Sequence, residues 1–239
     1  TGNNGIQRLD STGLLSLRME GFLEGAKCKS IAIDTLGRLW IGTEGRGIIV
    51  IDSGEIHQLR MKDGLPDDWI QKIIVDKKGN IWAAMYTGGL ASITIDSLDA
   101  FHIRTIPLPY SRLSSLIADQ QDRIWTGTND GRLFVVENNK LIWSSEKITG
   151  LPELPVRSLA FDVLGRIWVG TQSGGVFYGF AELNDKPLQS LGDGLHLSSQ
   201  NVYLLLADKS GQIWVGTETG VDKISILPDG TVKDIISFG

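Results

Sequence analysis

The chain is poor in cysteine and histidine and has no long apolar run. Its only cysteine, Cys28, cannot form a disulfide within the chain, so bridges do not reveal the redox compartment. The three histidines, His57, His102 and His196, lack metal-ligand spacing. No segment approaches the roughly 18 apolar residues of a membrane-spanning helix. The sequence therefore predicts no metal site, no cofactor and no membrane-spanning helix.

Excess positive charge and helical periodicity are also missing. The 23 basic and 28 acidic residues leave a net charge of −5. Nucleic acids and anionic membrane surfaces attract basic proteins, so no nucleic acid is expected as a partner. Apolar residues do not recur with the i, i+3, i+4 spacing of amphipathic helices. The 239 residues, 41% of them hydrophobic, suffice for one large all-β domain.

A repeated phrase is the dominant feature of what is present. Five times an aspartate lies six residues before a tryptophan, and the tryptophans are 42, 43, 43 and 46 residues apart. The pairs are Asp34 and Trp40, Asp76 and Trp82, Asp119 and Trp125, Asp162 and Trp168, and Asp208 and Trp214. A period in the low forties, built from short apolar runs, indicates a four-stranded propeller blade.

The fourth repeat shows the expected strands most clearly. After the innermost strand, the aspartate and a glycine reverse the chain, because the carboxylate accepts turn amides and glycine adopts a positive φ. The four expected strands are Val156 to Phe161, Ile167 to Thr171, Val176 to Phe180 and Leu188 to Leu191. Each repeat is therefore predicted to be an antiparallel meander.

Most of the repeated residues are interpreted as structural. The tryptophans should pack blade against blade, since an aromatic side chain buries roughly 150 to 250 Å². The aspartates should form turns, and the turn with Asp122 in place of glycine should be the least regular. Cys28 aligns with apolar residues of the other repeats, which favours a buried structural thiol.

We predict an all-β β-propeller with five complete repeats and two strands of a further blade, as a partial ring or as part of six to seven blades. The two extra strands are Gly5 to Leu9 and Leu14 to Met19. Because this blade lacks two strands, the chain is expected to be part of a longer protein. The predicted blades are 1–27 (partial), 28–69, 70–112, 113–155, 156–201 and 202–239.

Two consensus phrases resemble a known family. Asp-x-x-Gly-x-Ile-Trp-x-Gly-Thr, followed by a Gly-Gly pair, alternates with connectors such as Asp63-Gly-Leu-Pro66 and Thr149-Gly-Leu-Pro152. Together they resemble the two-component regulator propeller repeat over essentially the whole chain. Two segments depart from the pattern: Ala83-Ala-Met85 replaces the Ile/Val-Gly-Thr of other repeats, and Glu20-Gly-Phe-Leu23 replaces a connector.

The resemblance implies a ligand-sensing region outside the cytoplasm of a bacterial transmembrane protein. In that family, propellers precede the kinase or diguanylate cyclase modules of periplasmic or extracytoplasmic sensors anchored in the inner membrane, and several members respond to carbohydrates. The implied partners are a small-molecule or oligosaccharide ligand, downstream signalling domains of the same chain, and a second copy in a homodimer. This region itself is predicted to have no catalytic residues.

Two other functions stay open at this stage. A propeller lyase or glycan-processing enzyme would need a general base, and His196 is the one histidine expected in a loop on the binding face. A non-catalytic docking propeller would instead use its rim to bind a partner protein.

A ligand is expected at the mouth of the propeller channel, where loops converge. At two aligned positions of the repeats, called registers below, the residue changes from repeat to repeat while the surrounding phrase stays constant. The connectors add aromatic and cationic residues. The first register holds Glu44, Tyr86, Asn129, Gln172 and Glu218; the second holds Lys29, Gln71, Ser114, Arg157 and Tyr203; the connectors supply Trp69, Tyr110, Arg112 and His196. Aromatic rings beside amides and carboxylates suit a sugar.

Overall fold

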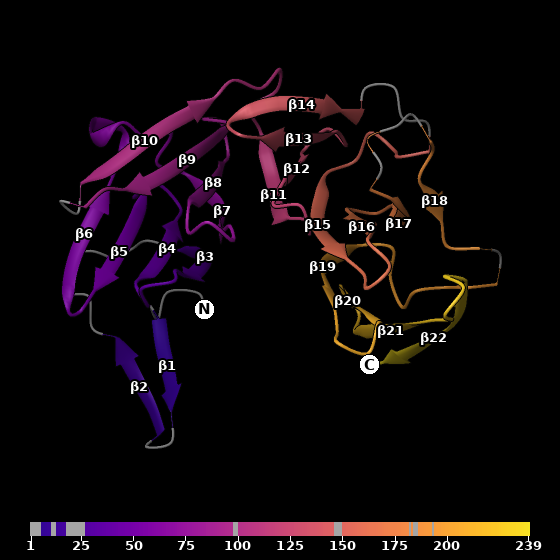
Figure 1. Ribbon diagram of the computed structural model, residues 1–239. Helices are drawn as coiled ribbons and strands as arrows, with labels where there is room; N and C mark the ends of the chain where they lie inside the picture. The colour runs from indigo at the N-terminus through magenta and orange to yellow at the C-terminus, as the bar shows by residue number, and fades with distance from the viewer. Residues whose placement is uncertain are drawn as a thin grey trace. The chain divides into compact units, whose positions relative to one another are not determined.

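The computed structural model describes residues 6–10, 13–17, 27–97, 100–145, 150–181, 183, 186–192 and 194–239. The chain divides into two compact units, Thr1–Leu113 and Ser114–Gly239. Each unit is built from short antiparallel sheets whose strands follow one another in chain order (Figure 1). The connector Glu20 to Leu23 lies outside the described residues.

The first unit contains a hairpin and two complete meanders. In the hairpin, Ile6 pairs with Leu17. The hairpin strands are β1 (Ile6–Asp10) and β2 (Gly13–Leu17). The first meander has β3 (Cys28–Ile33), β4 (Leu39–Thr43), β5 (Ile48–Asp52) and β6 (Glu55–Leu59); the second has β7 (Ile70–Val75), β8 (Ile81–Met85), β9 (Leu90–Ile95) and β10 (Phe101–Ile106). A 3-10 helix, η2 (Met61–Asp63), lies between them.

The second unit contains three meanders, the first of which begins at the unit boundary. They consist of β11 (Leu113–Ala118), β12 (Ile124–Thr128), β13 (Leu133–Glu137) and β14 (Lys140–Ser144); β15 (Val156–Phe161), β16 (Arg166–Thr171), β17 (Gly175–Phe180) and β18 (Gln189–Ser190); and β19 (Val202–Ala207), β20 (Ile213–Thr217), β21 (Val221–Ile226) and β22 (Val232–Phe238). The predicted all-β class, with five four-stranded blades and a two-stranded remainder, is confirmed. The second repeat, despite its Ala83-Ala-Met85 departure, also forms a complete sheet.

The repeated aspartate organises each hairpin between a first and a second strand. In the fourth repeat, one oxygen of Asp162 accepts the amides of Leu164 and Arg166, both at 2.9 Å. Its other oxygen accepts Trp168 Nε1 at 2.9 Å and Arg166 Nε at 2.7 Å. The aspartate is therefore a turn-former, as predicted, and it also binds the tryptophan that packs the blade.

The indole–carboxylate hydrogen bond recurs in all five repeats. Its Nε1 to Oδ2 distances are between 2.9 and 3.0 Å. An additional donor four residues after the aspartate is Arg38, Asn80, Arg123 or Arg166 in the first four repeats. Each carboxylate therefore accepts hydrogen bonds from turn amides, from the indole and, in four repeats, from the side chain four residues later. An aspartate suits the position because its two oxygens can accept all of these hydrogen bonds.

The expectation of an irregular third turn was wrong. Asp122 adopts a φ of 66°, close to the 76° of Gly165 in the fourth repeat. Its amide donates to Asp119 O at 3.1 Å, and the amide of Arg123 donates to the Asp119 carboxylate at 2.9 Å. Aspartate tolerates the left-handed region better than most side chains, so the turn keeps its geometry.

Titration of Asp208 should make folding sensitive to acid. Side-chain hydrogen bonds from Ser210 and Trp214, with the Gln212 amide, lower the pKa of Asp208 to about 2. Because the folded-state pKa lies below the ordinary value, the stabilisation is present above about pH 4 and is lost as the pH falls toward 2. Thermal unfolding of the Asp208→Asn variant should therefore depend less on pH between 4 and 2 than that of the parent. Equal slopes would contradict this assignment.

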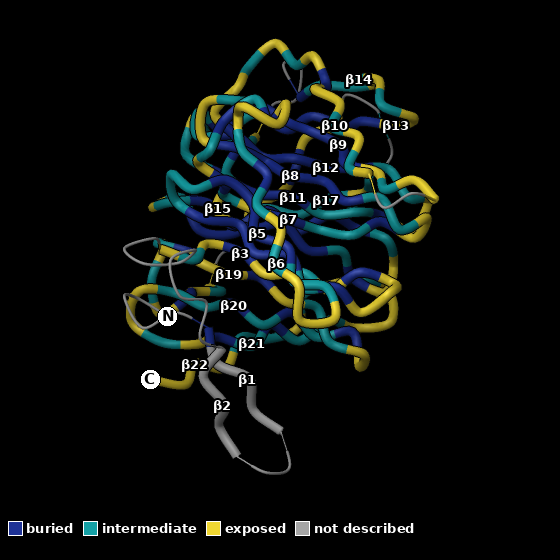
Figure 2. Tube along the Cα trace, turned by 90° about the vertical axis from the view of Figure 1, so that its left-hand side faces the viewer, coloured by how far each residue is buried: buried dark blue, intermediate teal, exposed yellow. Residues whose placement is uncertain are grey.

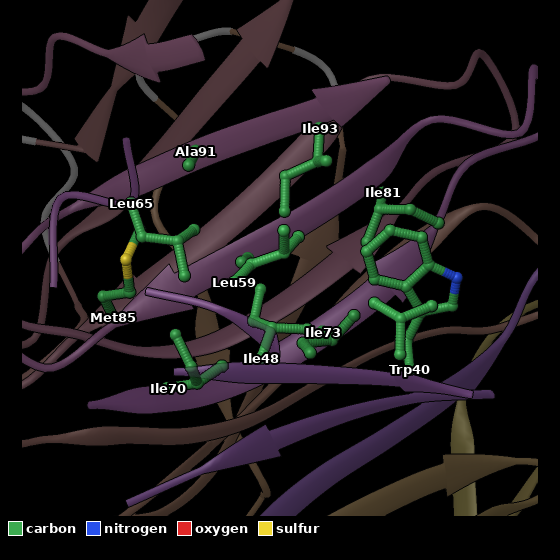
Figure 3. Packing of buried hydrophobic residues seen from close by; sticks show 12 residues of the cluster. Trp40, Ile48, Leu59, Leu65, Ile70, Ile73, Ile81, Met85, Ala91 and Ile93 are labelled. Atoms are coloured by element: carbon green, nitrogen blue, oxygen red, sulfur yellow. The ribbon is translucent and has the colours of Figure 1, made fainter. Parts of the chain in front are cut away.

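Neighbouring sheets within each unit pack face to face through the repeated tryptophans. In the first unit, β3 and β4 contact β7; in the second, β15 and β16 contact β19. Figure 3 shows Trp40 with Ile48, Ile73 and Ile81 in the first unit. Trp40 and Trp168 are fully buried, which supports the predicted packing role. Figure 2 shows that burial concentrates in the strands and decreases toward the loops.

The glycine of the Trp-x-Gly-Thr phrase makes this close packing possible. A Cβ built on Gly170 would lie 2.6 Å from Val202 Cγ1 and 3.2 Å from Leu205 Cγ on the next sheet. At Gly216, in the last sheet, the nearest atom is Leu204 Cβ at 3.4 Å, an ordinary contact. The glycine is therefore required by the inner strand of the following blade.

The Gly170→Ala variant should lose about 1–3 kcal/mol of unfolding free energy, because the added methyl overpacks the interface between two sheets. Gly216→Ala is the matched control, at the same register with room for the methyl, and it should be nearly neutral. Denaturant-induced unfolding of both variants measures the difference. A neutral Gly170→Ala variant would show that the sheets adjust without strain.

Three smaller expectations were tested by the described residues. Connector glycine Gly64 has a φ of 105°, and Leu65 beside it is 3% exposed in the core, as predicted for a tight bend and an apolar plug.

Cys28, which was expected to be buried, is only half-buried, and this partial burial raises the pKa of its thiol. The fourth strand of the fourth repeat, expected over Leu188 to Leu191, is limited to Gln189–Ser190. Leu188 packs inward instead of pairing and is 7% exposed.

Candidate functional site

Each meander has two distinct ends. We call the end with the aspartate turns the turn end. The opposite end, where the second strand leads into the third and the connector enters the first strand, is the loop end. The sequence-predicted ligand residues belong to the loop end, because both of their registers flank the loop-end termini of strands such as β4 and β3.

The threonine of the Gly-Thr phrase fixes the loop after the second strand. Thr43 Oγ1 donates to Gly47 O at 2.7 Å, and Thr171 Oγ1 donates to Gly175 O at 3.0 Å. In the second repeat, which has Met85 instead, Asp67 accepts the amide and hydroxyl of Thr87 at 2.9 and 2.7 Å. The loops are therefore held by side chains before any ligand arrives.

Backbone hydrogen bonds join four of the five loops to the preceding connector. The amide of the first-register residue donates to the carbonyl of the residue just before the inner strand. The pairs are Glu44 with Lys27, Tyr86 with Trp69, Gln172 with Pro155, and Glu218 with Asn201, at 2.9 to 3.1 Å. Lys27 and Asn201 were missed by the sequence reasoning, which chose the position two residues later; the constant spacing to the Gly-Thr phrase could have revealed them.

Four of the five second-register residues occupy β-bulges. The pairing of first and second strands shifts register between Cys28 and Ser30, and again at the same place in three other sheets. A bulge leaves one residue unpaired and turns its side chain outward. The bulge residues are Lys29, Gln71, Arg157 and Tyr203. Their variability therefore has a structural reason as well as any functional one.

The first unit brings an aromatic pair and a carboxylate together at its loop end. The rings of Trp69 and Tyr86 lie 6.4 Å apart at 42°, and they are 45% and 40% exposed. The indole covers Gly45, whose added Cβ would lie 3.4 Å from Trp69 Nε1. The backbones of Glu44 and Trp69 form an isolated antiparallel β-bridge. Lys27 Nζ lies 3.9 Å from the Glu44 carboxylate. This group of Lys27, Glu44, Trp69 and Tyr86 is called the aromatic site below.

The connector that carries Trp69 is braced on both sides. Asp67 accepts the amide of Trp69 at 3.1 Å, while Asp68 accepts Arg60 Nε and Nη2 at 3.0 and 2.7 Å. The Asp68 carbonyl also accepts the amides of Gly45 and Gly47, at 3.1 and 2.8 Å. Such bracing orders the indole in advance, so a ligand would lose little further side-chain freedom on binding.

The loop end of the second unit is more polar. Arg157 donates to Gln172 across the bulge. Asn201 Nδ2 lies 3.3 Å from the Tyr203 hydroxyl and 3.4 Å from the Glu218 carboxylate, and Tyr203 is 54% exposed. These residues form two small hydrogen-bonded groups on neighbouring sheets.

The remaining predicted residues have less developed surroundings. Arg112 and His196 are exposed, Tyr110 is half-buried, and Asn129 lies between the hydrogen-bonded Thr128 and Asp130. Ser114, in contrast, donates to Val156 O at 2.6 Å and Gly127 O at 3.2 Å. Its hydroxyl therefore joins two sheets and is structural. His57 and His102 lie on outer strands β6 and β10, away from the loop-end registers.

A polar pocket of about 400 Å³ lies at the same end of the second unit, beside Asp130, Arg132, Ser145 and Glu153. Arg132 Nε lies 3.1 Å from the Asp130 carboxylate. Sequence reasoning missed these residues because they fall outside the aligned registers. Within the residues that the structure describes, no group of three or more His, Cys, Asp or Glu side chains is arranged to hold a metal ion. The same residues contain no helix that is long and apolar enough to cross a membrane.

A family model described as two component regulator propeller matches residues 150–173 and 196–219. Each match begins in a connector and ends just after a Gly-Thr phrase, so it contains the aspartate–tryptophan hairpin. No curated protein matches the chain.

Several solved structures are similar to the chain. Extracellular domains of two hybrid two component systems from B. thetaiotaomicron align with TM-scores of 0.69 and 0.72, at 22% and 25% identity. They cover 95% and 90% of this chain, which itself spans less than a third of their length, 31% and 28%. A catalytically inactive virginiamycin B lyase from Staphylococcus aureus aligns with a TM-score of 0.73 at 13% identity, covering 93% of this chain and 72% of the lyase. That last likeness shows a shared fold alone.

Proposed function

Because the chain carries repeats of the two component regulator propeller family, we propose that it is the ligand-sensing part of a bacterial transmembrane signalling protein. The similarity to extracellular domains of hybrid two component systems supports a location outside the cytoplasm. A membrane anchor and a kinase or cyclase module would then belong to other parts of the same protein. Binding at the loop end, by a small molecule, a glycan or a partner domain, is the signal that this region contributes.

The aromatic site is the observation that carries this proposal. Large aromatic side chains are normally buried in soluble proteins, yet Trp69 and Tyr86 are close together and both substantially exposed on a braced connector. The C–H face of a sugar ring packs on such rings, while its hydroxyls hydrogen-bond to charged and amide groups. Glu44, Lys27 and Gln71 supply those groups on the same unit.

Removing the indole should weaken glycan binding at this site. With a panel of neutral and acidic oligosaccharides in isothermal titration calorimetry, Trp69→Ala should raise the Kd of any ligand found by about three- to tenfold, because one aromatic contact is lost. Unfolding should change little, since the indole is 45% exposed. Phe180→Ala, at the turn end of the other unit, is the control. Unchanged affinity in Trp69→Ala would remove the aromatic site from the proposal.

A propeller lyase or glycan-processing enzyme is the second candidate, favoured by exposed His196 in a connector and by the fold shared with the virginiamycin B lyase. Product formation from any oligosaccharide or from quinupristin, abolished in His196→Ala, would overturn the sensor proposal. A third candidate is a docking propeller. It would be favoured if ligand screens stayed silent while alanine substitutions at Arg157 and Tyr203 impaired dimer assembly.

A further inference from the structure

A second cavity lies at the turn end of the second unit, at the opposite end of the strands from the loops discussed above. It has a volume of about 490 Å³, within the usual range of small-molecule sites. Its walls come from the fourth repeat and from the turn between β21 and β22, and include Leu164, Arg166, Tyr178, Phe180, Lys186 and Asp229.

The cavity exists because the fourth strand of this sheet is short. β18 pairs only Ser190 and Gln189 with Phe177 and Tyr178 of β17, whereas β10 pairs with all six residues of β9. The chain before Gln189 therefore leaves the edge of β17 (Figure 1). Leu188 fills the space above Gly179, where an added Cβ would lie 2.7 Å from Leu188 Cδ2. The result is a space beside Phe180 that a longer strand would occupy in another blade.

An apolar turn tip and an aromatic ring are both exposed beside this space. Phe180 is 61% exposed, and Leu164, at the tip of the aspartate turn, is 44% exposed. The corresponding turn tips of the second and fifth repeats carry Lys78 and Ser210, whereas the first repeat carries Leu36, which is 75% exposed. An exposed apolar turn tip beside an exposed aromatic ring is more typical of a binding surface than of a solvated turn.

A buried cation with a spare donor lines the same cavity. Arg166 is 4% exposed, its Nε binds Asp162 and its Nη1 donates to Gly230 O, but its Nη2 has no hydrogen-bond partner among the described residues. In the third repeat, the corresponding Arg123 Nη2 donates to Ala181 O at 3.3 Å and Gln121 Oε1 at 3.4 Å. Buried donors are nearly always paired, so the missing partner of Nη2 indicates that the hydrogen bonding of this cavity-lining residue is incomplete.

We propose that this cavity is a second binding site, for a small organic monoanion that carries an apolar ring, such as an aromatic carboxylate. The ring packs against Phe180 and Leu164, while the carboxylate accepts from the Arg166 guanidinium, with the Lys186 ammonium adding positive charge. Asp229 also lines the cavity, and its carboxylate limits the ligand to one negative charge. The amide of Thr231 donates to Asp229 at 2.8 Å and lowers its pKa, so this carboxylate stays anionic at neutral pH.

The test uses benzoate as the probe and the 239-residue chain at neutral pH. In ¹H–¹⁵N correlation spectra, titration with benzoate should shift the amides of Gly179, Gly230 and Thr231. Benzyl alcohol, which has the same ring without the charge, should bind at least several-fold more weakly. Phe180→Ala should raise the Kd for benzoate by about three- to tenfold through the lost ring contact. Lys186→Gln should also weaken it.

Phe238→Ala is the matched control, because it removes an exposed aromatic ring that does not line the cavity, and it should leave benzoate binding unchanged. Arg166 itself is not substituted, since its loss would destabilise the sheet. Equal binding of benzoate and benzyl alcohol would overturn the anion specificity. Benzoate-induced shifts that are unaffected by Phe180→Ala, that lie at the loop end, or that are absent would overturn the site itself.

Discussion

Asp162→Ala should lower the unfolding free energy by about 3–5 kcal/mol, because it removes one member of a buried ion pair and leaves the other uncompensated. Asp162 and Arg166 are 3% and 4% exposed, and their closest atoms lie 2.7 Å apart. The substitution also removes the acceptor of the Trp168 indole and of two turn amides. Urea-induced unfolding, followed by tryptophan fluorescence, measures the loss.

Two further variants separate the ion pair from the turn. Asp208→Ala removes the same turn and indole hydrogen bonds in the fifth repeat, where Gln212 replaces the arginine, so its destabilisation should be smaller. Asp162→Asn keeps the shape and one acceptor oxygen and should lie between Asp162→Ala and the parent. If Asp162→Ala and Asp208→Ala lower the unfolding free energy by the same amount, the Asp162–Arg166 ion pair adds no stability beyond that of the turn hydrogen bonds.

Trp168→Ala should have an effect of similar size, about 3–5 kcal/mol, because it opens a cavity in the interface between two sheets. Trp168 is fully buried, stacks on Tyr178 with ring centroids 4.6 Å apart, and packs with Val202 and Leu205 of the next sheet. The Arg166 guanidinium carbon also lies 5.4 Å from the centre of the indole. Chemical denaturation and near-ultraviolet circular dichroism report the loss.

Trp214→Ala is the control at the same register. Trp214 is only half-buried, since no further sheet follows it among the described residues, and it contacts Phe238 and Lys223 of its own sheet. It makes the same hydrogen bond to its aspartate, at 2.9 Å. A smaller loss in Trp214→Ala than in Trp168→Ala would show that the repeated indole stabilises chiefly through the neighbouring sheet. Equal losses would assign its contribution to its own hairpin.

The fold could be read from the sequence because the same packing problem is solved five times. An aspartate, a glycine and a tryptophan at constant spacing identify a hairpin that binds its own indole, and neighbouring residues alternate as strands require. The predicted irregularity of the third turn was wrong because Asp122, which replaces the turn glycine, adopts the same positive φ. The short fourth strand at Gln189–Ser190 was missed because the inward packing of Leu188 depends on Gly179, in another strand.

The candidate sites were less accessible to sequence reasoning. Alignment of the repeats identified the loop-end registers, including Trp69 and Tyr86, but it did not distinguish the structural hydroxyl of Ser114 from residues free to bind a ligand. It also overlooked Lys27 and the turn-end cavity. The position of Lys27 and the shape of the cavity both depend on contacts between side chains of different strands. The repeat pattern does not predict these contacts where the residues differ between repeats.

The sequence by itself determined the class of fold, the number of complete blades and the turn that closes each hairpin, because these follow from local hydrogen bonding and short-range apolar periodicity. Only the tertiary structure decided which polar side chains are exposed and available to a ligand, and which form hydrogen bonds within the protein. The reason is that burial and pairing are properties of contacts between strands distant in the chain. At Arg166 and Arg123, the same residue in the same repeated turn ends with different partners because its neighbours in space differ.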